Sequence, residues 1–308
     1  MTKRRKVVFI GGYGRSGSTL LDRVLGHCSD RLFSGGEIRH IWKEGFEENR
    51  VCGCGRPFRS CEFWDSVTKR AFGGHEAFDS SEVLRLKNRV DRWWKIPRIA
   101  ACKPGPRFEA HRARYQDHLR RLYDAVAAES GSDVIIDSTK DPSHGYVLSS
   151  MPDVDLRVIH LVRDSRAVAH SWQRKKFNPG SGRDMNRYGL LKTGLEWGAI
   201  NALIGGLRRR SAGYALVRYE ELVADSNTQL RRILDMMDED ATVPGEGLYQ
   251  LRDDHTVAGN PIRFKRGDTR LRLDDEWQAS MPFSGKLVMT SLTLPGLARY
   301  GFGPSWAG

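Results

Sequence analysis

The stretch VVFIGGYGRSGSTLLDRVLG, residues 7–26, decides the fold prediction. Its first four residues are apolar and partly β-branched, which predicts a buried strand, and a glycine-rich turn then leads into a helical pattern that starts near Ser18. A strand, a glycine-rich turn and a helix N-terminus together hold a phosphate on backbone N–H groups and on the positive end of the helix dipole. The stretch therefore predicts an anion-binding loop.

The turn departs from the P-loop pattern G-x-x-x-x-G-K-[ST] at one fixed position. Gly12, Gly17 and Thr19 match the pattern, but Ser18 replaces the lysine that reaches the β- and γ-phosphates of ATP. A cation stands three residues earlier instead, as Arg15. The turn thus resembles a phosphate cradle without the cation that is directed at ATP.

Composition favours a globular protein with an anionic partner. The 308 residues are 39% hydrophobic and 29% charged, which argues against disorder. Lys and Arg number 50 against 38 Asp and Glu, and the formal charge of +12 favours nucleic acid, a membrane surface or a polyanionic small molecule. The basic residues form only short runs and match no nucleic-acid motif, so we expect no nucleic-acid partner.

The first apolar run is too short for a signal peptide, and no segment approaches the length of a membrane span. We therefore expect a soluble, cytoplasmic protein, and the sequence indicates no oligomeric state.

The chain has five cysteines, and an odd number without an export signal argues against a disulfide framework. Three of them, Cys52, Cys54 and Cys61, form the pattern C-G-C-G-x5-C. A zinc site needs a fourth ligand and normally a C-x2-C pair, and the nearest histidines, His40 and His75, lie outside the pattern. We expect buried thiols in a glycine-bracketed turn first, a disulfide second and a metal site third.

Short β-branched runs alternate with amphipathic helical patterns along the chain. The predicted strands are Val7–Ile10, Val134–Ile136, Val158–Val162 and Ala215–Tyr219. Helical faces lie between and after them, formed by Tyr115, Leu119, Leu122 and Val126, and by Leu230, Ile233, Leu234 and Met237 after an N-cap at Asp225 or Ser226. This alternation predicts one domain over residues 1–308, a P-loop-like three-layer α/β/α fold with a mostly parallel sheet, whose ligands bind beyond the carboxyl ends of the strands.

Residues 45–107 differ from the rest because they are rich in Gly, Arg and aromatic side chains and show little periodicity. We interpret them as an excursion that lines an acceptor pocket. The pair Trp93-Trp94 within it is expected to belong to the core.

A second motif, VIHLVRDSRAVAHSW at residues 158–172, follows a predicted strand. Arg163 at the strand end and Ser171 two turns into the next helix are placed to converge on one phosphate, since Arg offers a charged fork and Ser a short donor. The alternative is a structural ion pair of Arg163 with Asp164 or Asp137.

Together the two motifs resemble the sulfotransferase superfamily, which uses 3′-phosphoadenosine 5′-phosphosulfate (PAPS). The resemblance continues in the Arg218-Tyr219-Glu220-Glu221-Leu222 element and in Gly259-Asn260-Pro261-Ile262-Arg263-Phe264. Arg15 replaces the lysine of cytosolic small-molecule sulfotransferases, so the loop is closer to the tyrosylprotein and carbohydrate branches.

The resemblance implies transfer of a sulfuryl group from PAPS, without a metal ion, to a hydroxyl or less readily an amine of a small-molecule, glycan or lipid acceptor. It assigns the 5′ side of the nucleotide to Arg15, Ser16, Gly17, Ser18, Thr19 and Leu20. It assigns the 3′-phosphate to Arg163 and Ser171, and to the basic residues Arg263, Lys265 and Arg266. Tyr219 is expected on the adenine side.

The resemblance also suggests catalytic groups. Glu37, in Ser34-Gly35-Gly36-Glu37, resembles the catalytic glutamate of the tyrosylprotein branch and is expected to act as the base, with His40 as the nearby substitute. Arg15 is expected to stabilise the departing charge and Lys140 to serve as an auxiliary cation. A capping Glu37 and a solvated Lys140 are the structural alternatives. No spacing pattern connects the remaining candidates, His160, His170 and His255, to a site. We expect each of them to be a packed or a surface residue.

Two other functions are compatible with parts of the sequence. A P-loop nucleotide kinase is supported by Asp137, which ends an apolar strand, but the missing P-loop lysine counts against it. A nucleotide-binding module without catalysis is compatible with the positive charge but leaves Glu37 and Lys140 unexplained.

Overall fold

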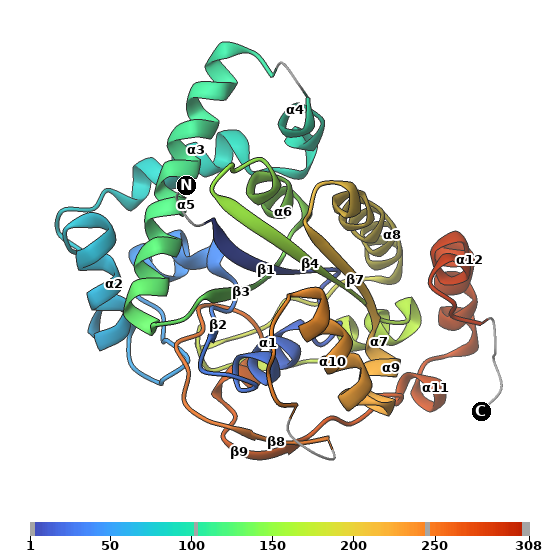
Figure 1. Cartoon of the computed structure of the whole chain (residues 1–308). Helices are drawn as coiled ribbons and strands as arrows, with labels where there is room; N and C mark the ends of the chain where they lie inside the picture. Colours follow the sequence, from blue (N-terminus) through green and yellow to red (C-terminus); the bar gives the residue numbers. More distant parts are fainter. Residues whose placement is uncertain (1–3, 102–103, 244–246, 304–308) are drawn as a thin grey trace.

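The computed structural model describes residues 4–101, 104–243 and 247–303. Within them, a five-stranded sheet with the order β2-β3-β1-β4-β7 lies at the centre of the molecule (Figure 1). Every pair of neighbouring strands in it is parallel. The strands are β1 (Arg5–Gly11), β2 (Leu32–Ser34), β3 (Val134–Lys140), β4 (Val154–Val162) and β7 (Gly213–Arg218). The predicted parallel α/β fold is confirmed, and the three-residue β2 is the strand that the sequence did not indicate.

Alternating side chains of β1 pack on opposite faces of the sheet, as the pleat of a strand requires. Val7 and Phe9 belong to the core that includes helices α5, α6 and α8, whereas Val8 and Ile10 belong to the core under α1 and α10 (Figure 1). The helices are α1 (Ser18–Gly26), α5 (Pro106–Ser130), α6 (Pro142–Ser149), α8 (Leu190–Gly206) and α10 (Ser226–Met236). The fold therefore has three layers.

The helical faces predicted from the sequence are buried. The four α5 residues named above are fully enclosed, as are Leu230, Ile233 and Leu234 of α10. Asp225 caps α10, since its carboxylate accepts the N–H of Thr228 at 3.1 Å.

The remaining elements lie around this frame. The helices are α2 (Glu62–Phe72), α3 (Ser80–Val90), α4 (Ile96–Ala100), α7 (Ser165–Gln173), α9 (Tyr219–Ala224), α11 (Trp277–Ser280) and α12 (Phe283–Arg299). Two antiparallel ladders pair β5 (Phe177–Asn178) with β6 (Arg183–Asp184) and β8 (Leu248–Leu251) with β9 (Gly267–Arg270). Within the described residues, no helix is long and apolar enough to cross a membrane.

The buried aromatic residues after position 45 extend the core that Val7 and Phe9 share with α5. Phe46, Phe72 and Phe78 pack together, and the ring centroids of Phe72 and Phe78 lie 4.1 Å apart. The prediction that Trp93 and Trp94 are core residues is wrong, because their exposed fractions are 64% and 54%. Both begin a short 3-10 turn, Trp93–Lys95, between α3 and α4, and their rings pack edge to face on each other outside the core.

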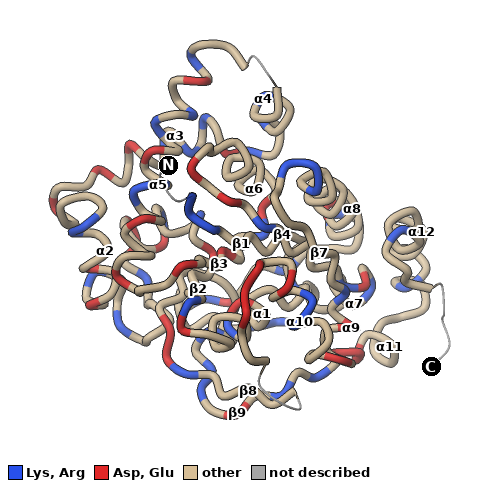
Figure 2. The backbone as a smooth tube through the Cα atoms, viewed as in Figure 1, with Lys and Arg blue, Asp and Glu red and all other residues tan. Residues whose placement is uncertain are grey.

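Lys and Arg are distributed over the whole backbone and form no basic tail (Figure 2). The positive charge that matters for function is therefore that of basic side chains gathered at one site, and not that of a basic tail.

Candidate active site

A cavity of about 830 Å³ lies where the five central strands end. Side chains that follow the carboxyl end of every strand line it, as expected for a parallel sheet. Eight basic and four acidic residues line the cavity, so its charge favours an anion. The basic residues are Arg15, Arg50, Lys140, Arg163, Arg174, Lys175, Lys176 and Arg183, and the acidic residues are Glu37, Glu44, Asp184 and Asp274.

Two glycines in the turn between β1 and α1 cannot be replaced by other residues without a steric clash. A Cβ at Gly12, where φ is 148°, would lie 2.2 Å from the carbonyl oxygen of Leu161. A Cβ at Gly17, where φ is 90°, would lie 2.8 Å from the ring of Tyr219. Gly17 also starts α1 without a side-chain cap, so the first turn of the helix, from Ser18 to Leu20, lines the cavity. The predicted anion-binding loop thus has the expected geometry.

Arg15 lines the cavity and carries two unpaired donors. Its guanidinium stacks on the ring of Trp172 at 4.6 Å, and its buried Nε and Nη2 have no hydrogen-bond partner among the described residues. Burial, together with the nearby charge of Arg174, lowers the pKa of Arg15. Unpaired buried donors are costly, so an anionic ligand that accepts from them would be stabilised here.

Arg163 lies directly beside the β1–α1 turn. It leaves the end of β4, donates from Nη1 to the carbonyl oxygen of Arg15 at 3.0 Å, and stacks on Tyr219 at 4.7 Å. Because the ring of Tyr219 also covers Gly17, the two anion-binding motifs share one wall. The ion-pair partner of Arg163 is Asp274, at 3.2 Å, rather than Asp164 or Asp137.

Glu37 and Lys140 meet in the lining of the cavity, beside the β1–α1 turn, because Glu37 Oε1 and Thr19 Oγ1 both lie next to Gly259. The Lys140 ammonium donates to Glu37 Oε1 and, at 3.1 Å, to the carbonyl oxygen of Ser138. The backbone of Glu37 is fixed because its N–H donates to Val257 at 2.7 Å. The cavity therefore holds a carboxylate and an ammonium group in contact, beside the anion-binding loop.

Comparison with known families then decides the assignment. Residues 7–242 match the profile described as "Sulfotransferase family". The chain belongs to the sulfotransferase family. The chain is accordingly a PAPS-dependent transferase, and the basic lining of the cavity, with the open helix start at Gly17, fits a donor of that negative charge.

Two solved structures have a similar fold. The sulfotransferase domain from the Synechococcus PCC 7002 olefin synthase is 21% identical, with a TM-score of 0.50 and 96% of both chains covered. The sulfotransferase domain from the curacin biosynthetic pathway is 15% identical, with a TM-score of 0.52, and the alignment covers 98% of this chain and 99% of that one. A search of curated proteins gives no match.

Most of the predicted site residues of this sulfotransferase come together. Ten of them line the cavity: Arg15, Gly17, Ser18, Thr19, Leu20, Glu37, Lys140, Arg163, Ser171 and Tyr219. Ser16 does not, because its hydroxyl turns inward and donates to the carbonyl oxygen of Tyr13 at 2.8 Å. His40 also stays outside the lining, with its Nε2 at 3.7 Å from Glu37 Oε2, and burial lowers its pKa well below the usual value.

The basic residues after Pro261 do not reach the cavity, in contrast to the prediction that they contact the 3′-phosphate. Arg263 is buried and donates to the carbonyl oxygens of Thr256 and Val51, at 2.8 and 2.5 Å. Arg266 pairs with Asp253, and Lys265 is likewise absent from the cavity lining. These side chains bind neighbouring loops, whereas Gly259, Asn260 and Ile262 of the same segment do line the cavity.

Asp137 does not support the kinase alternative. It is fully buried, accepts the hydroxyl of Tyr123 at 2.7 Å, lies 2.9 Å from His144 Nε2 and does not line the cavity. Burial opposes a charge on His144, but the carboxylates of Asp137 and Asp91 outweigh it and raise the pKa of His144 to about 9. Asp137 therefore stabilises the core and holds no metal-bound nucleotide.

Several site residues were missed at the sequence level. Asp22 is fully buried in α1 and accepts from the hydroxyls of Ser34 and Ser138 and from the N–H of Gly36. It thereby ties the helix of the anion loop to the strand ends that carry Glu37 and Lys140, and burial raises its pKa to about 7.

The outer wall of the cavity was also missed. Residues from Trp172 to Asn186, including the β5–β6 ladder, supply much of it. Of the described residues in 45–107, which were expected to line an acceptor pocket, Arg50 alone reaches the cavity. The basic run at residues 174–176 was the sequence signal that could have indicated this wall. It was not enough, because only the fold of the loop after α7 brings the run close to Arg15.

Proposed function

We propose that this sulfotransferase transfers the sulfuryl group of PAPS to a hydroxyl group of a small-molecule, glycan or lipid acceptor. One observation carries the proposal: Arg15, which has two unpaired donors, and the paired Glu37 and Lys140 line a single cavity. An amine acceptor is the less favoured alternative.

The donor-binding residues follow from their places in the cavity. The backbone of Gly17 to Leu20 and the hydroxyl of Thr19 would hold the 5′-phosphate, because helix starts bind phosphate groups. Arg163 and Ser171 would hold the 3′-phosphate, and Tyr219 would support the adenosine between the two sites. PAPS, when bound, supplies the sulfuryl group and leaves as 3′-phosphoadenosine 5′-phosphate.

The chemical roles follow from charge. Glu37 would accept the proton of the acceptor hydroxyl on a carboxylate oxygen, which makes that oxygen a better nucleophile. Arg15 would stabilise the negative charge that grows on the leaving phosphate oxygen, and electrostatic stabilisation of this kind is often the largest catalytic effect. Lys140 would hold the carboxylate of Glu37 in place and add positive charge beside the transferred group.

The acceptor would bind against residues 172–186. This segment forms the outer wall of the cavity and combines an aromatic ring at Trp172 with the cations Arg174 and Arg183. It is placed to contact a ligand that enters above the Glu37–Lys140 pair, and it contributes far more of the lining than residues 45–107 do.

Incubation with radiolabelled PAPS and a host-cell extract tests the proposal. We expect transfer of label to an organic acceptor, which mass spectrometry of the labelled product then identifies. Parallel titrations with PAPS and with ATP plus Mg²⁺ separate the alternatives. Tighter binding of ATP with metal would instead indicate a kinase, and binding of PAPS without turnover on a broad acceptor panel would indicate a module without catalysis.

A further inference from the structure

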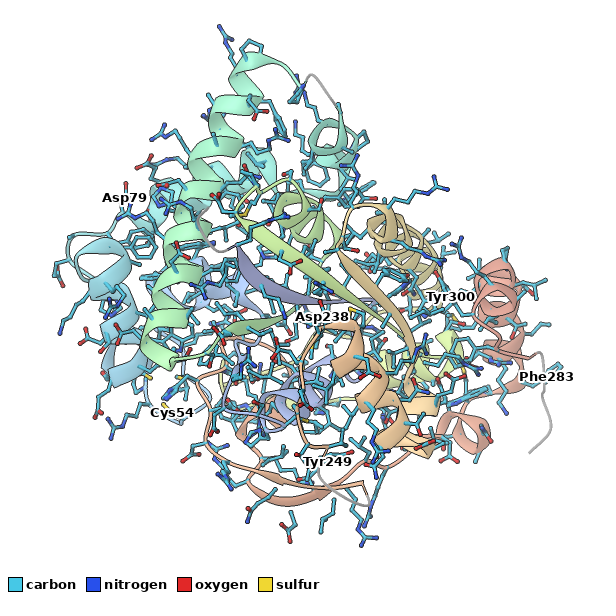
Figure 3. All side chains as sticks on the ribbon, viewed as in Figure 1. Cys54, Asp79, Asp238, Tyr249, Phe283 and Tyr300 are labelled. Atoms are coloured by element: carbon cyan, nitrogen blue, oxygen red, sulfur yellow. The ribbon has the colours of Figure 1, made fainter. Side chains whose placement is uncertain are left out.

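Three cysteines and one histidine converge at a place outside the cavity. Sγ of each cysteine and Nδ1 of the histidine all lie within 4.8 Å of one another. We call this group the cysteine–histidine cluster, and its members are Cys52, Cys54, Cys61 and His255. Figure 3 shows Cys54 near the edge of the molecule, on the same side as α2. The three cysteines are the ones that the sequence groups, and the histidine comes from 194 residues after Cys61.

Three of the six distances within the cluster lie within about 0.2 Å of those in a tetrahedral zinc site. With Zn–S of about 2.3 Å and Zn–N of about 2.0 Å, ligand atoms around a tetrahedral ion lie roughly 3.5–3.8 Å apart. Cys54 Sγ lies 3.7 Å from Cys61 Sγ, and His255 Nδ1 lies 3.3 Å from Cys61 Sγ and 3.8 Å from Cys52 Sγ. All three cysteines are unbonded, and a disulfide would need a separation of about 2.05 Å.

The backbone around the cysteines is built as a tight turn. Cys52 donates its N–H to Arg56 at 2.8 Å and accepts from Gly55 at 2.9 Å, which directs both thiols of the C-G-C sequence to one side. Cys61 is the N-cap residue of α2, so its sulfur lies near the positive end of a helix dipole. This position favours the thiolate form that binds metal.

The histidine is held in place by residues next to Cys61. The ring of His255 stacks on Phe63 with centroids 4.7 Å apart, and Trp64 Nε1 donates to the carbonyl oxygen of His255 at 2.9 Å. Such outer contacts orient a metal-bound imidazole.

Gly53 allows the two segments to approach each other closely. Its N–H donates to the carbonyl oxygen of Thr256 at 3.0 Å, and a Cβ at this position would lie 2.3 Å from Asp254 Oδ1. The C-G-C sequence thus needs glycine between its cysteines because the histidine-bearing segment packs directly on it.

Neighbouring arginines offset the charge of such a centre. Three thiolates, one neutral imidazole and a divalent ion sum to one negative charge. Arg266 donates to the carbonyl oxygen of Gly53 at 2.7 Å, and Arg263 bridges Val51 and Thr256, the residues that neighbour the first cysteine and the histidine. Two of the basic residues that do not line the cavity, Arg263 and Arg266, therefore lie beside this cluster.

We infer that the cysteine–histidine cluster binds one structural Zn²⁺ ion. Four protein ligands would leave no open position, as in structural rather than catalytic zinc sites. The ion would join the turn at 52–61 to the segment at 254–260. That segment supports the active site, because Val257 accepts the N–H of Glu37 at 2.7 Å and the N–H of Asn260 donates to Thr19 Oγ1 at 3.4 Å.

Metal analysis of the full chain, purified without a polyhistidine tag or chelator, is the direct test. We expect about one zinc per chain by inductively coupled plasma mass spectrometry. Replacement with Co²⁺ should produce the intense charge-transfer and ligand-field bands of tetrahedral thiolate coordination. Zinc far below stoichiometry, iron in its place, or a Cys54–Cys61 disulfide in unreduced peptide digests would overturn the inference.

Matched variants connect the metal to these four side chains. Cys54→Ser and His255→Ala should lose at least about 10-fold in zinc content. His255→Cys should keep the metal because it preserves four ligands. Cys28→Ser is the control, since Cys28 is also buried and unbonded but lies outside the cluster. Full zinc content in Cys54→Ser and His255→Ala, or equal loss in Cys28→Ser, would contradict the assignment.

Hydrogen exchange on the wild-type chain provides a readout that requires neither activity nor a variant. Removal of zinc by a strong chelator should speed exchange at residues 52–61 and 254–260, and re-addition of zinc should restore protection. Exchange that stays unchanged in these two segments after the metal has been removed would refute a structural role.

Discussion

The β1–α1 turn and the segment 259–266 both resemble sulfotransferase motifs, yet the structure uses them differently. Residues of the turn face the cavity from Gly14 onward, with Ser16 as the exception. The later segment divides: Gly259 and Asn260 line the cavity, but Arg263 is buried against Thr256 and Val51. A loop that binds through consecutive backbone groups is defined by its local sequence, whereas the role of a long arginine depends on which distant carbonyls it reaches.

The largest effect is expected from Arg15→Ala. Removal of the guanidinium, two of whose donors are unpaired, should lower kcat by roughly 1000-fold, because the proposed stabilisation of the charge on the leaving oxygen would be lost. Steady-state kinetics with saturating PAPS measure this change. Arg187→Ala, an exposed arginine outside the cavity lining, is the control and should stay within about twofold of the wild type. Equal kinetic constants for both variants would show that Arg15 takes no part in catalysis.

Glu37→Gln should lower kcat by about 100-fold while preserving the shape of the side chain. The amide cannot accept the acceptor proton, so the loss should persist over the whole pH range in which the enzyme is folded. PAPS binding, measured by calorimetry, should change much less than kcat. Full activity of this variant at every pH would show that another group acts as the base.

Arg163→Ala should mainly weaken donor binding. Loss of one charged hydrogen-bonding partner corresponds to roughly 1.5–3 kcal/mol, or about 10–100-fold in the Kd for 3′-phosphoadenosine 5′-phosphate. The same titration with adenosine 5′-phosphosulfate, which lacks the 3′-phosphate, should show little difference between variant and wild type. An equal loss of affinity for both nucleotides would show that Arg163 does not contact the 3′-phosphate.

Arg263→Ala is the corresponding substitution in the segment 259–266. Its guanidinium joins two loops and does not line the cavity, so the free energy of unfolding should fall by about 2–3 kcal/mol. The Kd for 3′-phosphoadenosine 5′-phosphate should change by less than about threefold in the folded variant. A loss of donor affinity as large as that of Arg163→Ala, without loss of stability, would restore the original prediction for this arginine.

Sequence reasoning predicted the sheet and the anion loop because each depends on short patterns, and it proposed separate roles for Glu37 and Lys140 without predicting that they pair. Apolar runs mark strands, and polar residues directly after parallel strands must meet at one edge of the sheet. It missed Asp22, whose donors Ser34, Gly36 and Ser138 lie 12, 14 and 116 residues further along the chain and are brought together only by the fold. It also missed the packing of His255 on the cysteine turn, because no local spacing relates residues that only tertiary contacts bring together.

The backbone conformations of Arg15 and Lys140 have a consequence for attempts to make this protein more heat-resistant. Both residues have φ of 70°, a left-handed conformation that glycine adopts at lower energetic cost. A design procedure that scores only folded-state energy would therefore replace both with glycine and remove two cations from the cavity. Stabilising substitutions should therefore be made elsewhere in the chain. At Arg15 and Lys140 the strained backbone holds a positively charged side chain in the cavity, where the proposed chemistry uses it.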